Sequence, residues 1–310
     1  MDNKQFIRDY QLILGDIQKP DEAIFIGYNS QTGEDSSLQM SFDITKKADT
    51  KRSGGNSCVI EIYNLKEDTL KRLQDTKLLG FYFKAGYRPI GAKLLLSGQV
   101  VQVSTKKVNT DWVTTIIAGE GYAELNETEL RKSLPVGITI EQAIEECRKQ
   151  IPNLAKGVFS GSNKNTTLPD GFPLNGSAKQ NLDRLCEAAR IEYRIDRGSL
   201  SIADEAGINT KNPEGDAFLL NEETGLLESP FWKQEDGTKL KKDKTRRQQV
   251  QFKALLNAQI VPASIIRIES KLVNGIFKVT ECRYTGQYER GDWIIEGYAS
   301  EILLDDIPKD

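Results

Sequence analysis

The sequence predicts an α+β protein that is mainly β, in which two β segments flank a small module of two helices and a hairpin. Three observations support this fold class. Short runs that alternate apolar and polar residues, separated by Gly, Pro and Asn, occur toward both ends of the 310-residue chain. Two helix-capping patterns lie between them. An ordered set of features in the first β segment also recurs in the last.

The first segment, 1–122, is predicted to be β with one helix. The helix is expected over 64–73, with Asn64 as its N-cap, because acidic residues occupy its first turn and basic residues its last. Gly98 is expected to separate two strands. Many short strands at this spacing are typical of a barrel or a sandwich. The expected strands are 23–28, 38–44, 58–63, 80–85, 93–97, 99–105 and 111–118.

The middle segment, 123–206, is predicted to be a helix-helix-hairpin module. A Thr-x-x-Gln pattern begins at Thr139 and a Ser-x-x-Gln pattern begins at Ser177. Both are capping boxes, and an apolar stripe at helical spacing follows each of them. The second helix is followed by a hairpin with strands 191–195 and 200–203.

The last segment, 207–310, is predicted to return to β. Its expected strands are 217–220, 248–256, 265–270, 276–284 and 293–298. The first and last segments share a turn glycine, a strand, a loop, an Asp-Trp pair that opens a second strand, and a Gly-Tyr pair that closes it. These features are Gly98, Asp111, Trp112, Gly121 and Tyr122 in one segment, and Gly275, Asp292, Trp293, Gly297 and Tyr298 in the other. The pattern predicts two β domains of one fold; the alternative is a chance likeness of two hairpins.

Composition excludes several classes of enzyme. The chain has no histidine, so a Ser-His-Asp triad, a Cys-His dyad and most catalytic zinc sites are excluded. Its 42 basic and 45 acidic residues are nearly balanced, which favours neither nucleic acid nor a membrane as a partner. The apolar runs are too short for a membrane helix, and the N-terminus lacks the apolar core of a secretion signal. No membrane insertion is expected.

Other motifs that carry chemistry are sparse. The four cysteines form no C-x-x-C pair, and we expect reduced, buried thiols, with Cys147 and Cys186 on apolar helix stripes in core contact. The sequence 119–121 is Gly-Glu-Gly in a β context, which is not a dinucleotide fingerprint. No cofactor and no metal are expected. Acidic pairs leave one catalytic alternative, a histidine-free, carboxylate-dependent hydrolase of cell-wall or surface glycans. The pairs are Asp204 with Glu205, Glu222 with Glu223, and Asp305 with Asp306.

One dense basic patch lies in a predicted loop between two strands of the last segment. Its six cations are Lys239, Lys241, Lys242, Lys244, Arg246 and Arg247. Phosphate or polyanion binding is one interpretation. No aromatic residues alternate with the cations, which weakens a role in binding single-stranded nucleic acid. A solvated loop, or a docking loop for an acidic protein neighbour, is the favoured interpretation.

Six stretches, taken together and in order, resemble a known family. The chain resembles the baseplate hub proteins of contractile-tailed bacteriophages, the group that includes the phage T4 hub protein. Where a turn of this family has proline and glycine, the chain has Ala258 and Ala263, which predicts a looser turn. The stretches are 56–73, 83–87, 98–100, 177–203, 224–230 and 255–262.

The resemblance implies a fold and a role in assembly rather than catalysis. Hub proteins of this kind carry two tube-type β-barrel domains, here 1–122 and 207–310, joined by α/β elements, here 123–206. They form homotrimers, whose six similar barrels adapt a hexameric tail tube to a trimeric central spike. The implied partners are the spike, tail tube or tube-initiator proteins and other baseplate proteins, with DNA passing through the channel without specific binding. The implied location is the virion tail baseplate, assembled in the host cytoplasm; a tailocin hub would share the fold.

Overall fold

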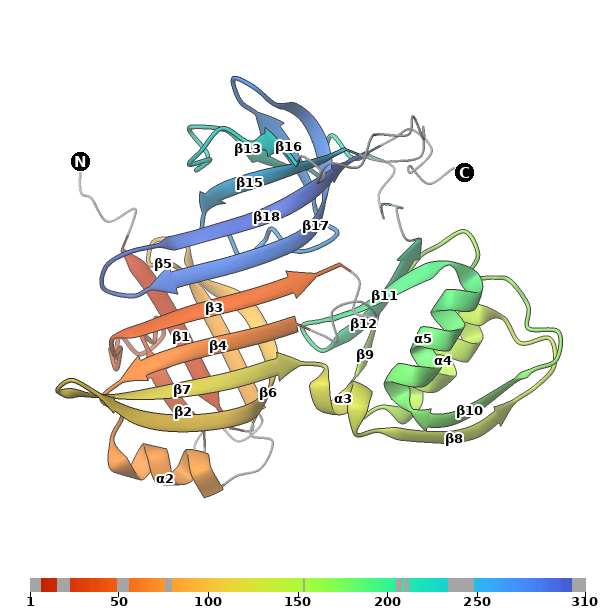
Figure 1. Cartoon of the computed structure of the whole chain (residues 1–310), viewed down its shortest axis with the longest axis horizontal. Helices are drawn as coiled ribbons and strands as arrows, with labels where there is room; N and C mark the ends of the chain where they lie inside the picture. Colours follow the sequence, from red (N-terminus) through yellow and green to blue (C-terminus); the bar gives the residue numbers. More distant parts are fainter. Residues whose placement is uncertain are drawn as a thin grey trace.

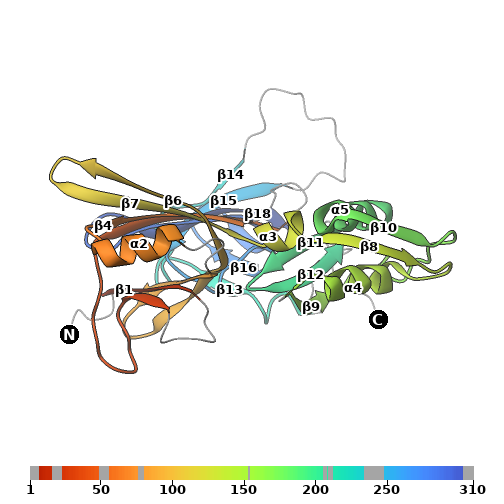
Figure 2. The ribbon, with the colours of Figure 1, turned by 90° about the horizontal axis from the view of Figure 1, so that it is seen from below.

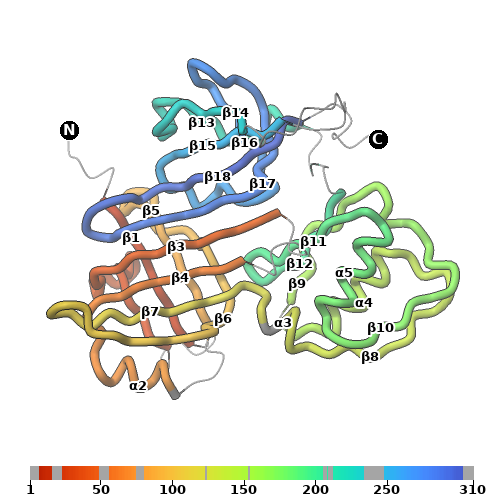
Figure 3. Tube along the Cα trace, viewed as in Figure 1, coloured from red at the N-terminus to blue at the C-terminus, as the bar shows by residue number. Residues whose placement is uncertain are grey.

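In the computed structural model, two β regions lie side by side and a smaller α/β module lies next to them (Figure 1). The structure describes residues 7–15, 23–48, 56–75, 80–152, 154–204, 208, 212–233 and 248–302. Figure 3 follows the chain from the first β region through the module and back to the last β region, so regions far apart in sequence are neighbours in space. The mainly β class that the sequence predicts is confirmed.

Each part has its own set of elements. The first β region contains β1 (Arg8–Leu14), β2 (Ile24–Gly27), β3 (Met40–Lys47), β4 (Asn56–Tyr63), α2 (Glu67–Asp75), β5 (Gly80–Tyr87), β6 (Gly91–Val108) and β7 (Asp111–Glu120). The module contains α3 (Tyr122–Asn126), β8 (Glu129–Leu134), α4 (Ile140–Gln150), β9 (Ala155–Phe159), β10 (Phe172–Ser177), α5 (Ala178–Ala189), β11 (Ile191–Asp196) and β12 (Ser199–Asp204). The last β region contains β13 (Phe218–Leu220), β14 (Phe231–Trp232), β15 (Gln249–Leu255), β16 (Ile265–Glu269), β17 (Asn274–Gln287) and β18 (Trp293–Glu301).

The two β regions form one continuous sheet. Thirteen strands of the described residues belong to it, in the order β14-β15-β18-β17-β3-β4-β7-β6-β5-β1-β2, with β16 and β13 attached beside β17. The regions join where β3 pairs antiparallel with β17, from Ser41 opposite Gln287 to Lys47 opposite Glu281. Burial alternates along β3 and β4, as expected for strands with one face on a core.

Two hydrophobic clusters stabilise the molecule. The larger one is shared by both β regions and includes Tyr10, Phe42, Phe83, Phe252, Phe277, Tyr284 and Trp293. The smaller one lies in the module, where α4 and α5 pack together, and takes its buried residues from between Leu125 and Ile202. Since the β regions share one sheet and one cluster, the module is the part with a separate core.

Two local predictions in the first β region are wrong. Gly98 does not separate two strands, because β6 continues through it. A Cβ there would lie 2.1 Å from the carbonyl oxygen of Gly119, so glycine allows the backbones of β6 and β7 to approach closely. Asn64 is not the N-cap, because α2 begins at Glu67. Asn64 has a φ of 55°, and its side chain accepts a hydrogen bond from the Trp112 N–H and donates one to Asp111. It fixes the start of β7.

The helix-helix-hairpin core of the module is confirmed. Thr139 and Ser177 cap α4 and α5 through complete capping boxes. Each helix ends within two residues of the last residue in its predicted apolar stripe. Strands β11 and β12 form the hairpin, whose two loop residues, Arg197 and Gly198, both have positive φ, as a type I′ turn requires. The sequence interpretation missed α3 and the strands β1, β8, β9, β10 and β14.

Candidate assembly site

The internal repeat is a repeat of strand order and register. The first region contains the antiparallel series β4-β7-β6-β5, and the last contains β15-β18-β17-β16. One row across the first series consists of Cys58, Ala118 and Val100. The matching row of the last series consists of Val250, Ala299 and Val279.

The two series also share a register shift. It follows the last valine of each row, between Val100 and Gln102 in the first series and between Val279 and Glu281 in the last. β-Bulges are specific features, so their shared position supports a common plan.

The tryptophans fit this alignment and the glycine-tyrosine pairs do not. Trp112 precedes Ala118 by as many residues as Trp293 precedes Ala299, so the two tryptophans are equivalent. The Gly-Tyr part of the predicted repeat is wrong. Gly121 lies just after the end of β7, whereas Gly297 lies inside β18. The match of these two pairs reflects composition rather than position.

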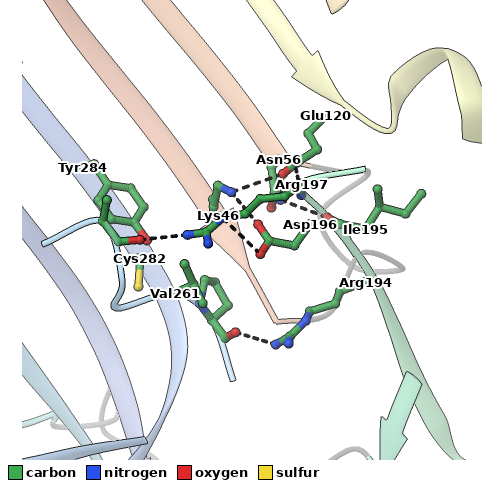
Figure 4. A network of polar contacts seen from close by, with 12 residues as sticks. Lys46, Asn56, Glu120, Arg194, Ile195, Asp196, Arg197, Val261, Cys282 and Tyr284 are labelled. Carbon is green, nitrogen blue, oxygen red and sulfur yellow. Dashed lines mark hydrogen bonds and ion pairs between the residues drawn. The ribbon is translucent and has the colours of Figure 1, made fainter. Parts of the chain in front are cut away.

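A buried charged junction joins the two β regions to the module, and Figure 4 shows it. At its centre is Lys46, whose side chain is 1% exposed. Its Nζ lies 2.6 Å from a carboxylate oxygen of Asp196 and 3.3 Å from one of Glu120. Lys46 comes from β3, Glu120 from the end of β7 and Asp196 from the end of β11. The junction therefore brings together three residues that are far apart in the sequence.

Hydrogen bonds complete the surroundings of Glu120. The side-chain amide of Asn56 donates to one of its oxygens at 2.7 Å, and the backbone N–H of Arg197 donates to the other. Asn56 also donates to the Ile195 carbonyl at 3.2 Å. Both oxygens of this buried carboxylate thus have donors, as buried polar groups require.

The charges at the junction shift the pKa values of its groups. Burial raises the pKa of Glu120, and the attraction of Lys46 only partly offsets it. Burial acts on Asp196 in the same direction, but Lys46, Arg197 and Arg194 together hold the pKa of Asp196 below its ordinary value. Burial alone would lower the pKa of Lys46; the two carboxylates more than offset this and raise it. Lys46 thus lies between two carboxylates that both favour its charged form, and Asp196 is the nearer of the two.

The same β11–β12 hairpin also binds the last β region. Arg197 donates to the carbonyl of Ala258 at 2.9 Å, and Arg194 donates to the carbonyl of Pro262. On β17, the Lys278 ammonium lies 3.1 Å from a carboxylate oxygen of Glu192, with both side chains largely buried. The hairpin therefore contacts both β regions at once. Chemically, this arrangement fixes geometry; it holds no reactive group in an open cleft.

The turn before β16 is ordered, contrary to the prediction that its alanines loosen it. Ala258 is 5% exposed, and Ala263 adopts a φ of 68°, the left-handed conformation that glycine favours. The Ala263 N–H donates to the Val279 carbonyl at 2.7 Å, and the Val279 N–H donates to the Ser264 carbonyl at 2.9 Å. These bonds hold the turn against β17.

Of the basic patch and the acidic pairs that the sequence singles out, only Asp204, Glu222 and Glu223 belong to the described residues. The basic residues Lys239, Lys241, Lys242, Lys244, Arg246 and Arg247 lie outside the described residues, as do Glu205, Asp305 and Asp306. Asp204 accepts hydrogen bonds from the Ser162 N–H, and Glu222 and Glu223 are exposed in a turn. The carboxylate pair that is close, Glu120 and Asp196, was missed, because no spacing in the sequence links its members.

The described part of the chain contains all four cysteines. All four cysteines are free and buried, as predicted, and burial raises the pKa of Cys147 to about 12. Cys147 and Cys186 lie on helices that pack together in the module core. Within the described ranges, no group of three acidic or cysteine side chains is arranged to hold a metal ion. No described helix has both the length and the apolar character to cross a membrane.

Comparison with known proteins finds likeness in structure alone. No family model matches the sequence, and no curated relative matches it. The tail protein of Neisseria meningitidis MC58 superposes with a TM-score of 0.63 at 10% identity, over 96% of this chain and 97% of that one. The 43 kDa tail protein of prophage MuSo2 from Shewanella oneidensis gives a TM-score of 0.63 at 8% identity, over 95% and 97% of the two chains. This chain has the fold of a phage tail protein.

The tail-protein fold extends to a secretion system. A component of the type VI secretion system of E. coli, which exhibits structural similarity to T4 bacteriophage tail proteins gp27 and gp5, superposes with a TM-score of 0.61 at 9% identity. That match covers 88% of this chain and 77% of the other. The likeness includes both β regions and the module, because it spans most of the chain.

We expect the buried junction to be essential for stability. Replacing Lys46 by Met should lower the free energy of unfolding by about 3–5 kcal/mol, because Glu120 and Asp196 lose their buried cation. Urea denaturation measures the change. Lys47→Met is the matched control, since Lys47 is 42% exposed and pairs at the surface with Glu281 at 3.6 Å. The control should cost less than about 1 kcal/mol. Equal losses for the two variants would show that the junction contributes no more than a surface pair.

Proposed function

We propose that this protein is the structural baseplate hub of a contractile phage tail. As a homotrimer it adapts the hexameric tail tube to the trimeric central spike and forms part of the DNA conduit. The likeness of fold to phage tail proteins over nearly the whole chain supports the proposal, and the order of the six sequence stretches that resemble hub proteins agrees with it. The role is one of assembly and not of catalysis.

The observation that carries the proposal is the internal repeat. One chain contains two β regions with the same strand order, the same register row and the same bulge. We assign them to two tube-type barrel domains, 1–122 and 207–310, with 123–206 as the connecting domain. Three such chains present six similar units. A ring of six matches a hexameric tube on one side, while its true threefold symmetry matches a trimeric spike on the other.

The charged junction fits this role. A protein that must present two similar units at a fixed angle needs a rigid connection between them. The β11–β12 hairpin provides one, since it binds Lys46 in the first region and the carbonyls of Ala258 and Pro262 in the last. The partners that we propose are the spike, tube or tube-initiator proteins and other baseplate proteins. The site of action is the virion tail, after assembly in the host cytoplasm.

Mass measurement in solution tests this function. We expect a particle of three chains, three times 34.7 kDa, when the protein is mixed with the spike protein of the same tail. Because a hub can depend on the spike for trimerisation, the protein is measured both alone and in the mixture. A protein that stays monomeric in both samples contradicts the proposal.

The basic loop is proposed as a docking element for an acidic neighbour in the baseplate. Replacing Lys241, Lys242, Arg246 and Arg247 together by Ser should change the free energy of unfolding by no more than ~0.5 kcal/mol per site, as is usual for surface positions. Binding to the tube and spike proteins, measured by co-sedimentation, should weaken and become less sensitive to salt. A variant that unfolds would show that the loop is buried or paired, and unchanged binding would remove its docking role.

A further inference from the structure

One edge of β6 has no partner strand in the described part of the chain. Strand β6 pairs with β7 from Gln99 to Val108, but with β5 only from Gly91 to Gln99. Residues 102–108 therefore have a neighbour on one side alone. Figure 2 shows the β6–β7 hairpin extending past the strands around it. An edge with unpaired N–H and C=O groups is a template for another strand.

The equivalent edge in the last region is occupied. By the shared register, residues 102–108 of β6 correspond to residues 281–287 of β17. That part of β17 pairs along its length with β3. The molecule thus contains this edge twice, once paired with β3 and once without a partner among the described residues. The paired edge on β17 is the template for the strand that would pair with the open edge on β6.

The two equivalent tryptophans differ in exposure in the same way as the two edges differ in pairing. Trp293 is 3% exposed, because it packs edge-on against Phe42 of β3 at 5.0 Å between ring centroids. Its indole N–H donates to the Gly86 carbonyl at 3.0 Å. Trp112, at the equivalent place beside the empty edge, is 52% exposed. A large exposed aromatic side chain beside an open strand edge is typical of an interaction surface.

The strand equivalent to β3 in the last region is β14. Ile44 of β3 lies opposite Cys58, and Trp232 of β14 lies opposite Val250, which belongs to the matching row. The outer edge of β14 is also unpaired among the described residues, since β14 is the terminal strand of the sheet order. Its two residues, Phe231 and Trp232, are 54% and 40% exposed. Both are large apolar side chains beside an open strand edge.

We propose that β14 of a second copy of this chain pairs antiparallel with residues 102–108 of β6. This rests on the self-association in the proposed function and adds its interface and register. In the template, Ile44 lies opposite Tyr284 and Asp43 opposite Thr285. The equivalent pairs between copies are Trp232 opposite Thr105 and Phe231 opposite Lys106. Trp232 of the second copy then covers the same face of the sheet as Trp112.

The backbone hydrogen bonds agree with this register. The Lys233 N–H donates to Gln249 of β15, so the backbone groups of the preceding Trp232 point to the open edge. In the template, the Tyr288 N–H donates to the Met40 carbonyl, and alternation makes Ile44 and Tyr284 a hydrogen-bonded pair. Trp232 and Thr105 are therefore the hydrogen-bonded pair between copies. Phe231 and Lys106 are the closer, non-hydrogen-bonded pair, at ~4.5 Å between Cα atoms.

Each copy has one such edge, on β6, and one such strand, β14, and six strands of the sheet order lie between them. Contacts of this kind join unlike surfaces, so repeating them generates a ring if the rotation closes and a filament if it does not. With three copies, every β6 edge in the ring is covered by a β14 strand.

The test is disulfide cross-linking between copies. The double variant Lys106→Cys, Phe231→Cys places two thiols within the ~4.4–6.8 Å Cα separation that a disulfide accepts. The four native cysteines are buried and do not compete. The protein is oxidised mildly over a range of concentrations, alone and with the spike protein, and examined by non-reducing electrophoresis. We expect linked dimers and trimers.

The matched control is Val108→Cys, Phe231→Cys. It places the thiol on the same face of β6 but two residues along, at ~7–8 Å from its partner, and should link little or not at all. Equal linkage in both variants overturns the register. A trimer by mass without linkage of residues 106 and 231 overturns this interface and leaves the proposed function standing. No self-association in any sample overturns both, and linked ladders longer than trimers support the pairing while contradicting the closed ring.

Discussion

The pairing of β3 with β17 is the constraint on which the rest of the structure depends. Strand β3 belongs to the first β region by its pairing with β4 and to the last by its pairing with β17. It buries Phe42 against Trp293 and carries Lys46 to the module. Without this pair of strands, the molecule would have two open sheet edges, and Trp293 would lose its contact with Phe42. Its hydrogen bonds join the halves of the chain, and its side chains fix their angle.

The charged junction explains why the module has a fixed place. Lys46 needs Asp196 and Glu120 within hydrogen-bond distance, because an unpaired buried charge is costly. The pKa of Asp196 is lowered by its cations, whereas burial raises that of Glu120. The two carboxylates therefore share one buried ammonium in a geometry that allows little sliding, which suits a structural component.

Local patterns predicted local structure and failed for long-range structure. The capping boxes at Thr139 and Ser177 located both module helices, since their hydrogen bonds close within a few residues. Gly98 misled the prediction because a glycine in a turn and a glycine under a neighbouring backbone look alike in sequence. Strand β8 was missed because only Leu130 and Leu134 face the core. The contacts of Lys46 with Glu120 and Asp196 have no spacing rule, and the tertiary fold alone brings them together.

The repeat connects this chain to its proposed assembly, because a chain that already contains one joint between equivalent β regions needs only a second such joint to form a ring. End-on electron-microscope images of the protein assembled with its spike test this account most directly. The account predicts class averages with threefold symmetry, six similar lobes and a central opening. Averages that show no closed ring, or a ring in which the lobes are not six, would contradict it.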